Sequence, residues 1–178
     1  MKQVAGREEV DLDRLVGHWV LDSSLSKVRF AERIFWGLVK VQGRFTAFSG
    51  SGTVESEGRV TGSVKVEAAS LDTKNDKRDE HLRSSDFFDV VRHPLITVDV
   101  SAVTMRGGVA DVHAVLAIKG VREPVTLTVS PEEVTADTIR LKAQAKVDRG
   151  RFGMTWNKIG VTGRAAIVAD AVFRRSAE

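Results

Sequence analysis

The chain of 178 residues contains no cysteine and no tyrosine, and it has only three prolines. Without cysteine, disulfide bonds, thiolate zinc sites and cysteine nucleophiles are excluded. No apolar run approaches the ~18 residues that a membrane-spanning helix needs. A chain of this length buries roughly 70% of its unfolded surface, which is enough to fold without disulfides or metal. Aromatic residues are also scarce, at 6%. Valine and alanine dominate the apolar positions, so these positions are small.

Charge is balanced rather than concentrated. Lysine and arginine number 27 against 24 acidic residues, which gives a net charge of +3 and a pI near 9.4. No run of five or six like charges occurs, so we expect no nucleic-acid partner. Residues 1–17 are polar, without the apolar run of a signal peptide. We therefore expect a polar N-terminal tail over residues 1–17, one domain over residues 18–178, a cytoplasmic location and no stable membrane insertion.

The dominant hydrophobic period is two, which predicts β-strands. In residues 138–148, Ile, Leu, Ala and Val alternate with Arg, Lys, Gln and Asp, as in a half-buried antiparallel strand. Residues 28–33, 63–68, 97–102 and 125–130 repeat this alternation. Residues 112–118 and 165–173 are apolar on both faces, so we expect a helix, a tail or a second subunit to cover them.

Glycine-containing turns are expected at residues 50–52, 57–58, 107–108, 119–120 and 160–163. Many strands separated by such turns indicate an all-β sandwich or barrel. Several runs reach about ten residues, or roughly 33 Å of strand, which indicates a tall barrel.

Helical signals are few. Residues 75–84 follow a capping signal at Asp72 and Thr73, and Asp79 and Arg83 can pair one turn apart on the surface of this helix. We expect Leu82 and the following Phe87 and Phe88 to hold it by packing. A second helical turn is expected over residues 34–40.

The densest polar cluster, residues 77–81, allows two interpretations. Its acid, base and cations could serve acid–base chemistry, with Asp79 and His81 as the reacting groups. The interpretation we favour is a capped, salt-bridged connecting helix, because carboxylates beside guanidinium groups are held as ions. The four histidines are scattered, so no metal site is expected. The tryptophans at positions 19, 36 and 156 could plug the core or contact a ligand, and we favour the first interpretation.

Several motifs occur in a fixed order along the chain. Their letters are W-x-x-D-x-x-x-S-x-x-x-F from Trp19 to Phe30, G-R-F from Gly43 to Phe45, S-L-D-T from Ser70, R-D-x-H-L-R-S from Arg78, and R-x-x-F-G from Arg149. In this series the chain resembles the YceI-like, polyisoprenoid-binding, lipocalin-like proteins. The resemblance covers nearly the whole chain from Trp19.

The resemblance implies an extended, eight-stranded antiparallel β-barrel with one or two short helices. It also implies a carrier of a long isoprenoid or amphipathic lipid, with no catalytic residues and with members that pair as dimers. No cofactor is expected beyond a co-purified polyisoprenoid or fatty ligand.

Small inward side chains would leave such a barrel hollow. Val66, Ala68, Val100, Ala102, Ala143, Ala145, Ala169 and Ala171 are the inward candidates. The alternative is that the alanines face outward, under a dimer partner or an end helix. The positions expected to line the tunnel or its mouth are Phe30, Phe45, Val66, Ala68, Leu82, Phe87, Phe88, Val100, Ala143, Ala145, Phe152, Ala169 and Ala171. Arg78, His81 and Arg149 are the candidates for binding a ligand head group.

Three functions follow as hypotheses. The first is the binding, transport or sequestration of a polyisoprenoid or an isoprenoid-quinone-like lipid, with no chemistry. The second is an isomerase or cyclase that uses Asp79 and His81 on an apolar substrate. The third is electrostatic binding to an acidic lipid surface, suggested by the pI and by Arg174 and Arg175.

Overall fold

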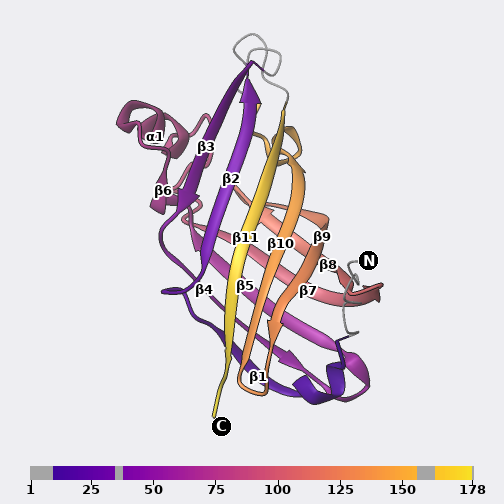
Figure 1. Cartoon of the computed structure of the whole chain (residues 1–178). Coiled ribbons are helices and arrows are strands. Elements are labelled where there is room, and N and C mark those ends of the chain that lie inside the picture. Colours follow the sequence, from indigo (N-terminus) through magenta and orange to yellow (C-terminus); the bar gives the residue numbers. More distant parts are fainter. Residues whose placement is uncertain (1–9, 35–37, 156–162, 178) are drawn as a thin grey trace, which may run out of the picture.

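Eight antiparallel strands close into a barrel in the computed structural model, which describes residues 10–34, 38–155 and 163–177 (Figure 1). This confirms the all-β barrel expected from the sequence. The strands of the closed ring, in spatial order, are β1 (Gly17–Leu21), β4 (Phe48–Val54), β5 (Val60–Glu67), β7 (Leu95–Arg106), β8 (Val109–Ile118), β9 (Val121–Val134), β10 (Thr138–Asp148) and β11 (Arg164–Arg175).

A second hairpin extends one wall of the barrel upward (Figure 1). Its strands are β2 (Lys27–Ile34) and β3 (Val39–Phe45), and the short β6 (Leu71–Asp72) pairs with the edge of β3. The C-terminal part of β11 pairs with β1, whereas its N-terminal part pairs with β2. Between these two pairings, where neither β1 nor β2 reaches β11, the Ser26 hydroxyl accepts a hydrogen bond from the Val172 backbone N–H at 2.9 Å. This side chain therefore replaces a missing strand partner.

The predicted alternation matches the strands closely. β10 covers residues 138–148, as predicted, and β7, β9 and β11 are each longer than ten residues. In β8, Val112, Ala114 and Leu116 are buried, whereas the intervening Val115 and Ala117 remain partly exposed. The described chain thus does not fully cover the outer faces of residues 112–118 and 165–173, and cover by a second subunit stays a prediction.

One predicted inward residue faces the other way. Ala102 is exposed, because the register of β7 against β8 shifts between Val100 and Ala102. Such a bulge adds one residue to a strand and reverses the alternation beyond it. Val103 and Met105 consequently face the interior in place of Ala102.

The β7–β8 and β8–β9 connections are tight two-residue turns. Gly107 and Gly108 both have positive φ, and so do Lys119 and Gly120, as the favoured hairpin turns require. The turn expected at residues 50–52 is wrong: these residues belong to β4 and pair with β5. Residues 57–58 do turn, within the 3-10 segment η2 (Ser56–Gly58). Of the turn expected at residues 160–163, only Gly163 lies within the described residues.

The described residues contain a single α-helix, α1 (Asp76–Arg83), and further 3-10 turns at η1 (Leu12–Leu15), η3 (Ala68–Ser70) and η4 (Arg149–Phe152). The α1 N-cap is Asn75, whose side chain accepts from the Arg78 N–H, and not the predicted Asp72 and Thr73. The second helical turn expected over residues 34–40 is wrong at both ends, because Ile34 ends β2 and Val39 begins β3. Residues 35–37 of that segment lie outside the described residues.

The core is divided along the barrel. The largest buried cluster lies at the end near α1 and contains Phe45, Leu71, Phe87 and Phe152. A smaller cluster of Leu15, Trp19 and Val54 lies at the opposite end. Between them, residues of β8, β9 and β10 form the inner wall of the barrel. The interior is therefore closed at both ends by large side chains and lined by smaller ones in the middle.

Candidate ligand-binding cavity

A cavity of about 320 Å³ occupies the interior between the two end clusters. This volume is near the lower limit of typical small-molecule sites, roughly 300–1,000 Å³. Valine, alanine and leucine side chains make up most of its wall. Six predicted tunnel residues line it: Val66, Val100, Ala143, Ala145, Ala169 and Ala171.

The cavity exists because the inward positions around it are small. Ala143 pairs with Ala169 and Leu141 with Ala171 in the β10–β11 register. On the β4–β5 wall, Gly52 stands directly opposite Gly62. A Cβ on Gly62 would lie 2.9 Å from the Ser51 carbonyl oxygen, so these strands pack too closely for a side chain there.

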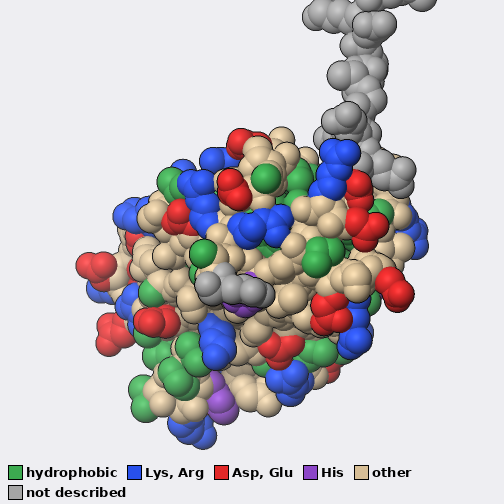
Figure 2. Space-filling model, turned by 90° about the horizontal axis from the view of Figure 1, so that it is seen from below, with side chains coloured by type: hydrophobic (Ala, Val, Ile, Leu, Met, Phe, Trp, Pro, Cys, Tyr) green, Lys and Arg blue, Asp and Glu red, His purple; other side chains and the backbone are tan. Residues whose placement is uncertain are grey.

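The lower end of the cavity is covered by residues 10–16, which we call the strap. Val10, Leu12 and Leu15 of the strap line the cavity, and Leu15 is buried against Trp19. The Trp19 indole N–H donates to the Leu15 carbonyl at 2.8 Å. The strap therefore packs as part of the barrel, although the sequence placed it in a polar tail. Figure 2 views this end, where charged side chains of both signs surround scattered hydrophobic ones.

Arg175 fastens the strap to the barrel. Its guanidinium donates to the carbonyls of Val16 at 2.6 Å and Arg14 at 3.1 Å, both in the strap. Its Nε donates to the Ala136 carbonyl in the β9–β10 turn at 2.6 Å. The same group stacks on Trp19, 4.5 Å from the ring centroid. One side chain thus joins the strap, a hairpin turn and the plugging tryptophan.

The other predicted tunnel residues lie outside the cavity, in or against the large cluster at the α1 end. Phe45 contacts Phe30 and Phe88 with ring centroids 5.3 and 5.9 Å apart. The residues placed here are Phe30, Phe45, Ala68, Leu82, Phe87, Phe88 and Phe152. They fill this end of the barrel. The expected packing of α1 through Leu82 and the two following phenylalanines is confirmed.

Of the predicted head-group residues, Arg149 is buried in the same end. It lies 3.2 Å from the Glu32 carboxylate and 5.6 Å from the Phe87 ring centroid. Burial raises the pKa of Glu32, and the Arg149 guanidinium and a backbone hydrogen bond from Gly163 partly offset this rise. The pair closes the upper end of the barrel with charge held away from water.

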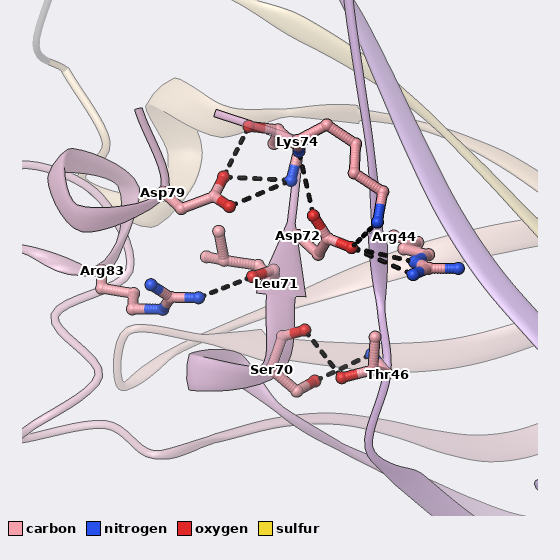
Figure 3. A network of polar contacts seen from close by, with 9 residues as sticks. Arg44, Thr46, Ser70, Leu71, Asp72, Lys74, Asp79 and Arg83 are labelled. Atoms are coloured by element: carbon pink, nitrogen blue, oxygen red, sulfur yellow. Dashed lines mark hydrogen bonds and ion pairs between the residues drawn. The ribbon is translucent and has the colours of Figure 1, made fainter. Parts of the chain in front are cut away.

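Arg78, Asp79 and His81 are engaged in local structure. Asp79 is buried and accepts hydrogen bonds from both the backbone N–H and the hydroxyl of Thr73 (Figure 3). Arg78 Nε donates to that hydroxyl at 2.7 Å, and His81 lies 3.0 Å from the Asp86 carboxylate. None of the three lines the cavity. The expected surface pair of Asp79 with Arg83 is replaced by these contacts.

Arg83 and Asp72 join α1, β6 and β3 through further polar contacts (Figure 3). Arg83 donates to the carbonyls of Ala69 and Leu71, at 2.9 and 2.7 Å. Hydrogen bonds from the side chain and backbone of Lys74, assisted by Arg44, lower the pKa of Asp72 to about 2. The cluster of residues 77–81 therefore works as a connecting helix, the interpretation favoured from the sequence.

Several cavity residues escaped the sequence interpretation. Val112, Val129 and Leu141 line the cavity, and their alternation with polar residues could have identified them. Trp19 both plugs the lower end and contacts the cavity, whereas the other two tryptophans lie outside the described residues. Within the described ranges, no group of three or more acidic or histidine side chains could hold a metal, and no helix is long and apolar enough to span a bilayer.

Comparison with known families identifies the domain. Residues 19–173 match the family model of the YceI-like domain, so the chain belongs to this family. A UPF0312 protein of Pseudomonas aeruginosa (strain LESB58) is 39% identical over 87 residues, which are 48% of this chain and 46% of that relative. This match thus spans less than half of the relative's length. A UPF0312 protein of Staphylococcus aureus (strain bovine RF122 / ET3-1) is 29% identical over 78% of this chain and 84% of its own.

Solved structures share the fold at lower identity. BcnA of Burkholderia cenocepacia has a TM-score of 0.77 and 22% identity over 85% of this chain and 98% of its own. A polyisoprenoid binding domain from Saccharophagus degradans, implicated in plant cell wall breakdown, has a TM-score of 0.71 and 16% identity over 89% of this chain and 98% of its own.

Proposed function

We propose that this member of the YceI-like domain family binds a long apolar or amphipathic chain, such as a polyisoprenoid or an isoprenoid-quinone-like lipid, inside its barrel. It carries or sequesters this ligand without changing it. The observation that supports the proposal is the cavity of about 320 Å³ with a largely aliphatic wall. The polyisoprenoid binding domain from Saccharophagus degradans, which has the same fold, supports the ligand class.

Burial of the chain provides the binding energy. Lining atoms around an empty space lose packing contacts, and a bound chain restores them. Each buried CH₂ contributes about 0.8 kcal/mol, so a few isoprene units outweigh the cost of ordering the chain. Because the cavity is small, we expect only part of a long ligand to lie within it, with the remainder leaving past the strap.

The isomerase or cyclase alternative finds no support in the geometry. Asp79 and His81, the acid–base pair it requires, both lie in α1 and do not line the cavity. Neither group could therefore reach a substrate held in the cavity, which favours binding without chemistry.

The test is a ligand assay on purified protein. Organic extraction followed by mass spectrometry should release a prenyl lipid or a fatty molecule, and ligand-free protein should take up a long-chain quinone. Ala145→Phe places a ring in the cavity, so loading should fall at least tenfold. Ala117→Phe, on the outward face of β8, is the matched control and should load normally. A clean extract with no quinone uptake, or equal loading of both variants, would contradict the proposal.

A further inference from the structure

A second hollow lies on the outside of the barrel. It is a groove of about 1,020 Å³ that crosses the outer face of β3, β2, β11 and β10. We call it the basic groove, because eight cationic side chains line it: Arg29, Arg33, Lys40, Arg44, Lys74, Lys142, Lys146 and Arg164. The carboxylates among its described lining residues are Glu32 and Asp72.

Charge is strongly segregated toward this groove. Eight cations and two carboxylates give it a formal charge of +6, whereas the whole chain carries +3. The rest of the chain therefore carries a formal charge of −3. One face of the protein is therefore cationic although the net charge of the sequence is small. A cationic face of this kind attracts an anionic partner.

Much of this positive charge is not compensated locally. Asp72 pairs with both Arg44 and Lys74, at 3.1 and 2.9 Å. Its one negative charge therefore neutralises only one of these two cations. Glu32 pairs instead with the buried Arg149, and Arg29 pairs with Asp170 of β11. None of the ion pairs formed among the described residues involves Lys40, Lys142, Lys146 or Arg164.

The shape of the groove indicates an extended anionic surface rather than a single anion. Its cations lie on both rims, from β3 to β10, which are three strand spacings or about 14 Å apart. Lys142 and Lys146 are separated by a further four residues along β10. One phosphate cannot reach both rims, whereas several lipid head groups can.

The floor of the groove is apolar and small. Ala31, Ala166 and Val168 are its partly exposed floor residues. Among the described residues of the lining, Phe30 is the one aromatic, and its ring packs inward on Phe45. Single-stranded nucleic acid is usually bound by stacking its bases on aromatic side chains, which this floor does not offer.

We propose that the basic groove docks the protein on an anionic phospholipid bilayer. This inference rests on the proposed function, because an apolar ligand must be collected from a membrane or delivered to one. Each lysine or arginine near an anionic bilayer strengthens binding about fivefold, and salt screens this attraction. Docking leaves the barrel folded and the bilayer intact.

The experiment measures sedimentation of the full chain with vesicles. One set contains phosphatidylcholine with 30% phosphatidylglycerol, and the other contains phosphatidylcholine alone. Lys142→Glu with Lys146→Glu should lower binding to the anionic vesicles at least 25-fold. The matched control is Arg59→Glu with Lys65→Glu. It changes net charge equally, at the residue before β5 and within β5, the strand directly opposite β10 in the strand order. The control should retain most of the binding.

A milder variant, Lys142→Gln with Lys146→Gln, guards against misfolding and should lower binding by an intermediate factor. Wild-type binding should also fall steeply between 50 and 500 mM salt. Equal loss in both charge reversals, equal binding to neutral vesicles, insensitivity to salt, or groove-dependent binding of nucleic acid or of a second copy without vesicles would overturn the proposal.

A separate arm loads each variant with quinone from detergent, with no bilayer present. Normal loading of the groove variants together with lost vesicle binding supports docking. If wild-type protein binds anionic vesicles but takes up no quinone, the proposed function fails while docking is retained. If quinone is taken up without vesicle binding, docking alone fails.

Discussion

Replacement of Arg175 with alanine should release the strap that covers the lower end of the cavity. The variant loses two hydrogen bonds to strap carbonyls, one to the β9–β10 turn and a cation–π contact with Trp19. We expect the barrel itself to survive, because β11 still pairs with β10 along its whole length. The effect should therefore be local opening rather than global unfolding.

The magnitude follows from these contacts. Hydrogen bonds to charged groups contribute about 1.5–3 kcal/mol each, and an exposed cation–π contact about 0.5–1 kcal/mol. Once the half-buried guanidinium is removed, water replaces some of the lost hydrogen bonds, so we expect strap closure to weaken by about 2–4 kcal/mol. At 1.4 kcal/mol for each factor of ten, the open fraction rises roughly 30- to 700-fold.

Two measurements report this opening. Hydrogen exchange of peptides covering residues 10–20 should accelerate by that factor, and a bound fluorescent quinone analogue should dissociate faster. Arg175→Lys keeps the charge but cannot reach three carbonyls at once, so it should restore only part of the closure.

The control is Arg174→Ala, which removes the same charge from the adjacent position. Arg174 contacts Thr138 and Asp22 and makes no strap contact that we observe among the described residues. If Arg175→Ala matches Arg174→Ala in both exchange and dissociation, Arg175 does not hold the strap closed.

The remaining predictions concern the upper end of the barrel and α1. Arg149→Met leaves the Glu32 carboxylate buried without its cation, which should cost about 3 kcal/mol of unfolding free energy at pH 7. Because the raised pKa of Glu32 then rises further, protonation relieves this cost, and urea unfolding should show a smaller loss at pH 4 than at pH 7. Arg151→Met, which removes an exposed ion pair, should change stability little at either pH. Asp79→Asn should lower stability by about 1–2 kcal/mol but leave quinone loading unchanged, and lost loading would contradict its structural role.

Strand identity was predictable because alternation is a local property of the chain. Residues 138–148 form β10 as predicted, and the tight turns at residues 107–108 and 119–120 follow from their glycines. The bulge that exposes Ala102 was not predictable, since it depends on how β7 pairs with β8. The turn predicted at residues 50–52 was wrong for a similar reason. Their glycines allow close packing of β4 against β5, and the sequence does not distinguish such glycines from those of a turn.

Sequence reasoning found part of the cavity wall. Ala143, Ala145, Ala169 and Ala171 do line a cavity. Alternation along residues 138–148 indicates the inward phase of Ala143 and Ala145, whereas pairing with β10 sets that of Ala169 and Ala171. The phenylalanines were assigned to the same tunnel, yet they fill the α1 end. Residue type alone does not say at what height along a barrel a side chain lies.

By itself, the sequence determined the class of fold, the family and the small inner wall, because hydrophobic period and side-chain size are written along the chain. Only the tertiary structure decided where the hollow ends, that residues 10–16 cover it, and that Arg175 holds them there. It also gathered scattered lysines and arginines from five separate segments into one cationic groove. Those features depend on strand neighbours far apart in sequence, and it is closure of the barrel that brings them together.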